Sequence, residues 1–123
     1  MLLNLSDHPS ANWSAEQTDA AILRWGSIED LPFPHIPPEW EHYEVEELVE
    51  QYYNKIRKLY PIAVHLMGEL TFCFSLIAKL QQAGIPCVAA TTLRNTVDNP
   101  DGTKVATFRF IKFRSFPELI PFR

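Results

Sequence analysis

The fold is decided by one stretch, residues 61–92, which reads PIAVHLMGELTFCFSLIAKLQQAGIPCVAATT. An apolar run at residues 62–67 stops at Gly68, a segment with helical periodicity extends to Gly84, and a second apolar run begins at Cys87. This change of hydrophobic period predicts a strand, a crossover helix and a parallel strand. The first turn opens onto a helix N-terminus, where free amides and the helix dipole favour an anion.

The rest of the chain contains further strands and helices. A capping-box spacing at Ser14 starts a helix that is expected to end at Gly26. The inner surface of that helix is expected to include Ile22 and Leu23. Four prolines within residues 32–38 predict a surface connection, because proline disrupts helix interiors and central strands. The other expected elements are strands at 2–5, 27–33, 62–67 and 87–90, helices at 44–60 and 71–83, and hairpin strands at 93–97 and 104–113.

Several apolar side chains are assigned to the core from their position in these patterns. Cys73 and Cys87 have no metal or disulfide spacing and are expected to be buried thiols. In the helix at 71–83 the apolar residues cover much of the circumference, and Phe74 is counted among them. The tail at residues 117–123 carries Leu119, Ile120 and Phe122 and is expected to dock on the body or on a second subunit.

The order of elements predicts the fold class. Strands and helices alternate as β-α-β-α-β-α-β-β-β, which indicates an α/β fold, a Rossmann-like three-layer sandwich with a mainly parallel sheet and a C-terminal antiparallel hairpin. The length fits a single domain over residues 1–123. Ligands of such open sheets bind outside the carboxyl ends of the strands.

Composition narrows the class of function. A net charge of -4 argues against a protein that holds long DNA or RNA by its phosphates. The start MLLNLSDHP lacks the pattern of a signal peptide, and no stretch is apolar enough to span a bilayer, so a cytoplasmic protein is expected. The motifs of dinucleotide cofactors, P-loops and serine hydrolases are missing, and no residues have metal-ligand spacing. We therefore expect neither a cofactor nor a metal.

Three loops are expected at the carboxyl edge of the sheet, after the first, third and fourth strands. Their hydroxyls, amides, imidazole and guanidinium suit phosphate, ribose and base edges. The candidate residues are Ser6, Asp7, His8, Pro9 and Ser10 with the nearby Trp13, then Met67, Gly68, Glu69, Thr71 and Phe72, and then Thr91, Thr92, Arg94 and Asn95.

Each of these residues also has a purely structural explanation. Ser10 is as well suited to capping a helix as to binding a ligand, and Glu69 can stabilise its own helix as a first-turn carboxylate. Trp13 either packs beside the capping box or stacks on a base. His65 lies inside an apolar strand and is expected to be a hydrogen-bonded core histidine, which leaves His8 as the favoured functional imidazole.

The chain resembles a known group at three places. These are LNLSDHPS at residues 3–10 with Trp13 and Gln17, VHLMGELTF at residues 64–72, and ATTLR at residues 90–94. They look like the small stand-alone proteins encoded beside type III CRISPR systems, which are related to the CARF (CRISPR-associated Rossmann fold) domains and include ring nucleases. The resemblance covers nearly the whole chain.

The resemblance implies a homodimer that binds a cyclic oligoadenylate, most readily cyclic tetraadenylate, across its twofold axis and cleaves it without a metal. It implies that His8, Ser10 and Arg94 act on the reacting phosphate, with His8 as general acid or base, while the other candidates hold the ring. Two alternatives stay open: a sensor or sponge that binds the ring without cleaving it, and an interaction subunit of a CRISPR complex.

Overall fold

The computed structural model describes residues 1–119 and has the α/β organisation expected from the sequence. The elements of this part of the chain are, in order, β1 (Leu2–Ser6), the short 3-10 helix η1 (Ser10–Asn12), α1 (Ala15–Trp25), β2 (Ile28–Asp30), α2 (His42–Leu59), β3 (Ala63–Met67), α3 (Leu70–Gln82), β4 (Cys87–Asp98) and β5 (Lys104–Ser115).

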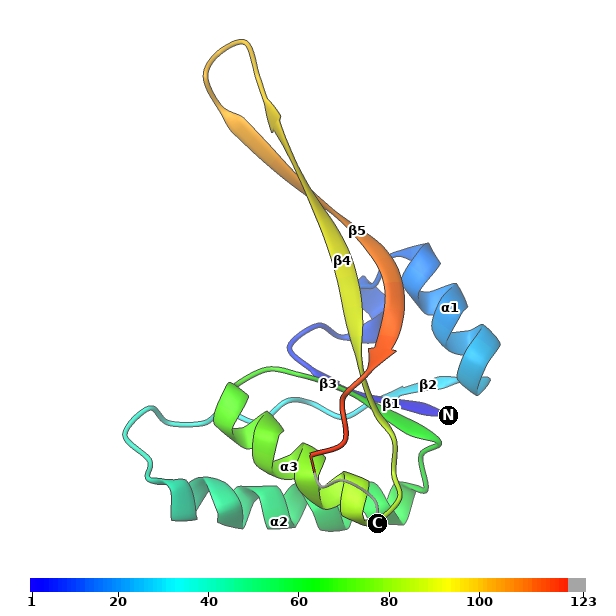
Figure 1. The fold of residues 1–123 in the computed structure, drawn as a ribbon, viewed down its shortest axis with the longest axis vertical. Coiled ribbons are helices and arrows are strands. Elements are labelled where there is room, and N and C mark those ends of the chain that lie inside the picture. The colour runs from blue at the N-terminus through cyan, green and yellow to red at the C-terminus, as the bar shows by residue number, and fades with distance from the viewer. Residues whose placement is uncertain (120–123) are drawn as a thin grey trace.

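The strands form one mixed sheet in the order β2-β1-β3-β4-β5 (Figure 1). β1 pairs in parallel with β2 and β3, β3 pairs in parallel with β4, and β4 and β5 are antiparallel. α1 covers one face of the sheet, and α2 and α3 cover the other. The Rossmann-like sandwich with a C-terminal hairpin is therefore confirmed.

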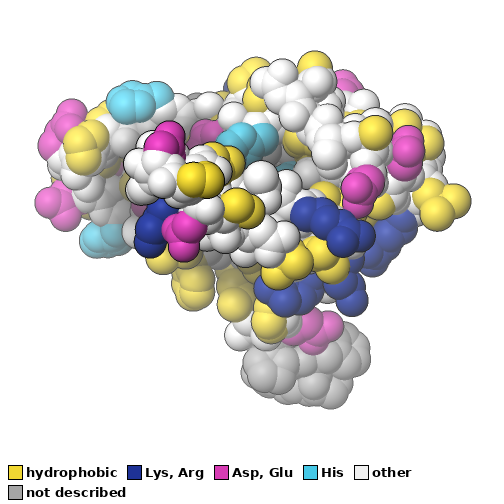
Figure 2. All heavy atoms as spheres, turned by 90° about the horizontal axis from the view of Figure 1, so that it is seen from above, with side chains coloured by type: hydrophobic (Ala, Val, Ile, Leu, Met, Phe, Trp, Pro, Cys, Tyr) yellow, Lys and Arg dark blue, Asp and Glu magenta, His cyan; other side chains and the backbone are white. Residues whose placement is uncertain are grey.

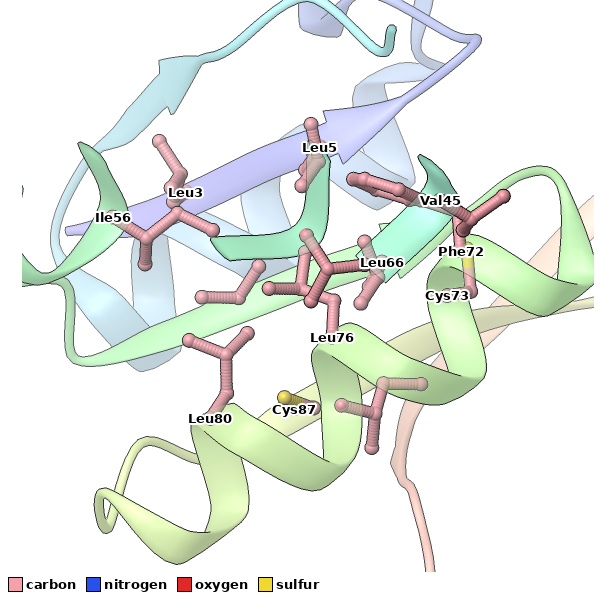
Figure 3. Packing of buried hydrophobic residues seen from close by; sticks show 13 residues of the cluster. Leu3, Leu5, Val45, Ile56, Leu66, Phe72, Cys73, Leu76, Leu80 and Cys87 are labelled. Atoms are coloured by element: carbon pink, nitrogen blue, oxygen red, sulfur yellow. The ribbon is translucent and has the colours of Figure 1, made fainter. Parts of the chain in front are cut away.

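Alternation along the strands divides the core into two parts. Odd-numbered Leu3 and Leu5 pack with even-numbered Val64 and Leu66 against α2 and α3 (Figure 3). Leu2 and its neighbours face α1 in a second cluster. Both cysteines lie in the larger cluster, and burial raises the pKa of Cys73 and Cys87 to about 12. The prediction of buried thiols is confirmed.

Three apolar side chains do not lie where the pattern predicted. Leu23 is 90% exposed, and Ile22 and Phe74 are 47% and 61% exposed. α1 contacts the sheet along a narrow stripe that includes Ala21 and Trp25, which are one helical turn apart. Leu23 lies midway between them in sequence and so points away from the sheet. Counting apolar residues overestimated the width of each buried face.

The second and fourth strands also differ from the prediction. β2 has three residues rather than the expected seven at 27–33, and the tract that follows contains Pro32 and Pro34, whose nitrogens carry no hydrogen for a ladder. The two strands expected at 87–90 and 93–97 are one strand, β4. A register shift against β5 falls between Thr91 and Thr92, as in a β-bulge, which bends a strand without ending it.

The tail docks on the body where the structure describes it. Gln81 Nε2 donates to the Pro117 carbonyl oxygen at 2.9 Å, and Gln81 Oε1 accepts from the Leu119 amide at 2.9 Å. The prediction for Ile120 and Phe122 concerns residues outside the described part. Among helices of residues 1–119, none combines the length and apolar character needed to cross a membrane.

Candidate functional site

The carboxyl ends of β1 and β3 lie side by side at the point where the chain connections diverge. Ser6, the last residue of β1, is the register partner of Met67, the last residue of β3. The connection after β1 leads to α1 on one face, whereas the connection after β3 leads to α3 on the other. Open sheets bind ligands at such a switch point. The first two predicted loops are therefore neighbours.

Asn4 is the centre of a polar cluster beneath these loops. Its Nδ2 donates to the His8 carbonyl oxygen and to Asp30 Oδ1, both at 2.8 Å. Its Oδ1 accepts from the Ser6 hydroxyl at 2.8 Å. Asn4 is 1% exposed and Ser6 is 6% exposed. Both side chains are therefore buried supports of the loop and are not accessible to a ligand. Ser6 was predicted as a ligand contact and lies beneath the surface.

His65 also belongs to this cluster. It is buried and hydrogen-bonded, as the sequence predicted. Its Nδ1 lies 2.9 Å from Asn4 Oδ1, and because that oxygen can only accept, the proton is on Nδ1. Burial, with a smaller contribution from His8, lowers the pKa of His65 to about 4. The ring is neutral at pH 7 and packs edge-on against Trp13 and Phe113.

Asp30 fixes the end of the loop that follows β1, where η1 begins. Its carboxylate accepts from the Ser10 amide at 3.1 Å and from the Ser10 hydroxyl at 2.8 Å. Burial raises the pKa of Asp30, but the hydrogen bonds from Asn4 and Ser10 outweigh it and leave the pKa below its usual value. The sequence analysis missed Asp30 and Asn4. Their positions could have indicated them. Asp30 ends a third parallel strand at the same edge, and Asn4 is a register partner of both Asp30 and His65.

His8 takes part in the cluster through its backbone. Its carbonyl oxygen accepts from Asn4 and from Trp13 Nε1, the latter at 2.9 Å. The imidazole is exposed, as are the side chains of Asp7 and Pro9. Trp13 is half-buried between its hydrogen bond and the His65 ring, so it has the packing role that the sequence offered as one of two possibilities.

The N-terminus of α3 is capped by the chain itself. Glu69 accepts from the amides of Thr71 and Phe72 at 3.0 and 2.9 Å, and the Thr71 hydroxyl donates to the same carboxylate. Burial raises the pKa of Glu69, but these hydrogen bonds lower it further than burial raises it. The amides expected to receive a ligand phosphate are thus occupied by a carboxylate. An arriving phosphate has to displace Glu69 to reach them.

Gly68 is required by a close approach within the chain. A Cβ on Gly68 would lie 2.3 Å from Cζ of Phe33, whose ring comes from the proline-rich connection. The Phe33 ring packs edge-on against Phe72, which is fully buried. The Phe72 side chain therefore belongs to the core, and only its backbone amide is part of the edge.

The third predicted loop is part of β4 and rises into the hairpin. Thr91, Thr92, Arg94 and Asn95 are strand residues, and the Thr91 hydroxyl donates to the Lys112 carbonyl oxygen at 3.0 Å. The Arg94 guanidinium lies over the Phe108 ring, 5.9 Å from its centroid. The prediction of a loop at residues 91–95 is wrong, because the ladder with β5 continues through it.

The two loops at the switch point are acidic. Asp7, Asp30 and Glu69 lie in or beside them, and residues 6–10 and 67–72 contain no Lys or Arg. A hollow of about 560 Å³ lies elsewhere, between the C-terminal ends of α2 and α3, where it is lined by residues that include Tyr53 and Arg57. Within residues 1–119 no three His, Cys, Asp or Glu side chains are grouped to hold a metal ion.

Comparison with models of protein families gives a match over most of the chain. The model of a family described as "Uncharacterized protein MJ1673 family" matches residues 1–114. No curated protein matches the chain.

Proposed function

The chain belongs to the MJ1673 family, and we propose that it binds a cyclic oligoadenylate, most readily cyclic tetraadenylate, and cleaves it as a ring nuclease of type III CRISPR defence. The observation that supports this most is the meeting of the β1 and β3 loops at the switch point of the sheet. These are the two loops that the resemblance to CARF proteins assigns to the ring. A homodimer would present two such edges to a ring of matching symmetry.

The proposed reaction uses a nucleophile that the substrate carries. A ribose 2′-oxygen attacks the adjacent phosphorus, the bond from phosphorus to the 5′-oxygen breaks, and the products are a 2′,3′-cyclic phosphate and a 5′-hydroxyl. One proton leaves the 2′-hydroxyl and one reaches the 5′-oxygen, so the atoms balance with no further reactant. The exposed His8 imidazole is the proposed group for one of these proton transfers.

Rigid positioning is the second part of the proposal. An in-line attack needs the three reacting atoms to be aligned, and a fixed loop reduces the entropy lost in aligning them. Asn4 and Asp30 tie the loop at residues 8–10 to the strands by three hydrogen bonds. Two more, from Asn4 to Asp30 and from Trp13 to the His8 carbonyl oxygen, support the same arrangement. In this proposal the buried cluster holds the loop in place, and His8 and Ser10 are the residues nearest to the ring.

The acidic loops set a condition on this function. A ring with one negative charge per phosphate approaches Asp7, Asp30 and Glu69, which repel it. Cations have to offset that repulsion, and Arg94 is the candidate that the resemblance assigns to the phosphate. Removal of its charge by Arg94→Gln is expected to weaken ring binding, whereas Arg24→Gln on α1 is the matched control.

The test is a single-turnover reaction of excess protein with cyclic tetraadenylate in EDTA, with the products resolved by chromatography. We expect a linear product with a cyclic phosphate, and we expect His8→Ala to slow its formation about 100-fold or more while binding is retained. An intact ring that nevertheless stays bound would replace the enzyme with a sensor or sponge. No binding at all, by calorimetry or thermal shift, would favour an interaction subunit.

A further inference from the structure

The β4–β5 hairpin projects from the body as a two-stranded ribbon (Figure 1). Its base is held by Phe110 and Phe113, which pack with α1, and by an ion pair of Arg109 with Glu16 at 3.9 Å. We call residues 92–110 the arm; Arg109 and Phe110 anchor its lower end, and the rest extends outward. Seven register pairs make the arm roughly 23 Å long. A two-stranded ribbon is marginally stable by itself in water, so a long exposed arm indicates a partner.

Both faces of the arm carry exposed apolar side chains. Register partners in an antiparallel ladder project to the same face, and successive pairs alternate between faces. Val97 and its partner Val105 are 54% and 46% exposed, and Leu93, four residues before Val97, shares their face at 48% exposure. Phe108, the partner of Arg94, is 67% exposed on the other face. A ribbon that touched only solvent would gain nothing from these residues.

A second group of exposed apolar side chains lies beside the switch point. Met67 ends β3, and Leu70 and Phe74 lie one turn apart at the start of α3. They are 39%, 77% and 61% exposed. We call Leu70 and Phe74 the α3 patch, and Met67 lies near them at the end of β3. The arm and the α3 patch are thus two unpartnered apolar surfaces on the same chain.

Charge makes the two surfaces complementary. The arm carries Arg94, Lys104 and Arg109 against Asp98 and Asp101, and Lys112 and Arg114 follow at its base, whereas residues 1–86 carry five Lys and Arg against twelve Asp and Glu. In the view of Figure 2, most of the visible Lys and Arg side chains gather in one region. Five glutamates fall within residues 39–47 at the start of α2, where Val45 packs beside Phe72 of α3 (Figure 3). The acidic start of α2 and the α3 patch therefore lie at the same end of the molecule.

We propose that the arm of one copy docks on the α3 patch and the acidic start of α2 of a second copy, and that the exchange is reciprocal. The face of the arm with Phe108 and Arg94 joins an apolar ring to a cation, and it meets an acidic surface with an apolar centre; two copies related by a twofold axis satisfy both surfaces at once. Nucleic acid would attract Arg94 but would leave the α3 patch uncovered.

The exchange also brings a cation to the acidic switch point. The α3 patch adjoins the turn at Gly68, so an arm seated on it through the face of Phe108 and Arg94 carries that guanidinium to the edge of the other copy. This part rests on the proposed function, since it gives the second copy the guanidinium that its own β1 and β3 loops lack. Each site would then be incomplete without the partner's arm.

The first test measures the mass in solution by sedimentation equilibrium. We expect a dimer that Phe108→Asp on the arm and Phe74→Glu on the α3 patch each weaken at least tenfold in dissociation constant. Leu23→Glu, at a still more exposed apolar residue of α1, is expected to leave the dimer intact. Circular dichroism confirms that each variant is folded. A monomeric wild type, or arm and patch variants that dimerise like the control, would overturn the proposal, as would an RNA-binding arm on a monomer.

The second test locates Arg94 without any need for catalysis. Chains with Arg94→Cys are mixed under oxidising conditions with larger, tagged chains carrying Asp7→Cys, an exposed position of the β1 loop. The buried native thiols are poor competitors, since their pKa values are about 12. We expect a mixed disulfide between the two chains. A dimer that forms no such disulfide would overturn the placement of Arg94, and this result is independent of whether the ring is cleaved.

Discussion

His65 makes the stability of the protein depend on pH in a defined direction. Its pKa is about 4 in the folded state, against 6.5 for an ordinary histidine, because the ring is buried among Asn4, Trp13 and Phe113 and is repelled by His8. Between these values the unfolded chain binds a proton that the folded chain does not. The contribution of His65 is therefore complete above pH 6.5 and is lost as the pH falls toward 4.

The size of the effect follows from the two pKa values. At pH 5 the unfolded histidine is almost fully protonated while the folded one is almost fully neutral, and each pH unit below 6.5 costs about 1.4 kcal/mol. Lowering the pH from 7 to 5 should therefore remove about 2 kcal/mol of unfolding free energy through His65.

Urea unfolding of the wild type and of His65→Gln at pH 7 and pH 5 isolates this contribution. The amide of glutamine can still donate to Asn4 Oδ1, and it does not titrate. All other groups are common to both proteins, so the difference between their pH dependences belongs to His65. We expect the wild type to lose about 2 kcal/mol more than the variant. Equal losses, or a smaller loss in the wild type, would refute a neutral buried His65.

Three further substitutions test the edge of the sheet. Gly68→Ala should destabilise the fold by about 1–3 kcal/mol in urea unfolding, and adding Phe33→Ala should remove the clash although it opens a cavity of its own. Asp30→Ala should cost about 1–2 kcal/mol, since it leaves the Ser10 amide without its acceptor, whereas Asp30→Asn should cost less. Glu69→Ala should cost about 1 kcal/mol as a lost helix cap and should tighten ring binding in calorimetry, because it uncovers the α3 amides; weaker binding would instead make Glu69 a ligand contact.

Much of the fold could be predicted because the hydrophobic periodicity of the sequence is clear. The apolar runs and the helical segment of residues 61–92 gave β3, α3 and the start of β4, and Ser14 does accept from the Gln17 amide as an N-cap. Gly26 and Gly84 end their helices with positive φ angles of 86° and 78°. These features depend on local chemistry, which a single sequence records directly.

Tertiary features were less accessible. Hydrophobicity does not reveal how much of a helix its neighbours cover, so Leu23 and Phe74 were placed inward although they are exposed. The pair of threonines at 91 and 92 resembled the end of a strand, but pairing with β5 carries the ladder through a register shift. The length of the arm, which depends on that pairing, could not be foreseen.

The candidate site was predicted in position better than in chemistry. The β1 and β3 loops do meet at the edge, since parallel strands end together. The roles of individual side chains depend on partners far away in sequence: Ser6 is held by Asn4, and Ser10 by Asp30, 20 residues later. The amides at the start of α3 were expected to bind a ligand, but they donate to the Glu69 carboxylate. A helix N-terminus favours a negative charge, but this preference does not determine whether a side chain or a ligand supplies it.

Hydrogen exchange in the presence of cyclic tetraadenylate measures whether the ring binds at the switch point of the sheet. We expect the ring to slow exchange at residues 6–10 and at residues 68–72, the two loops of the switch point, and we expect AMP at the same concentration to leave exchange there unchanged. Protection confined to the hollow near Tyr53 and Arg57, or no protection anywhere, would contradict a ring-binding site at this edge of the sheet.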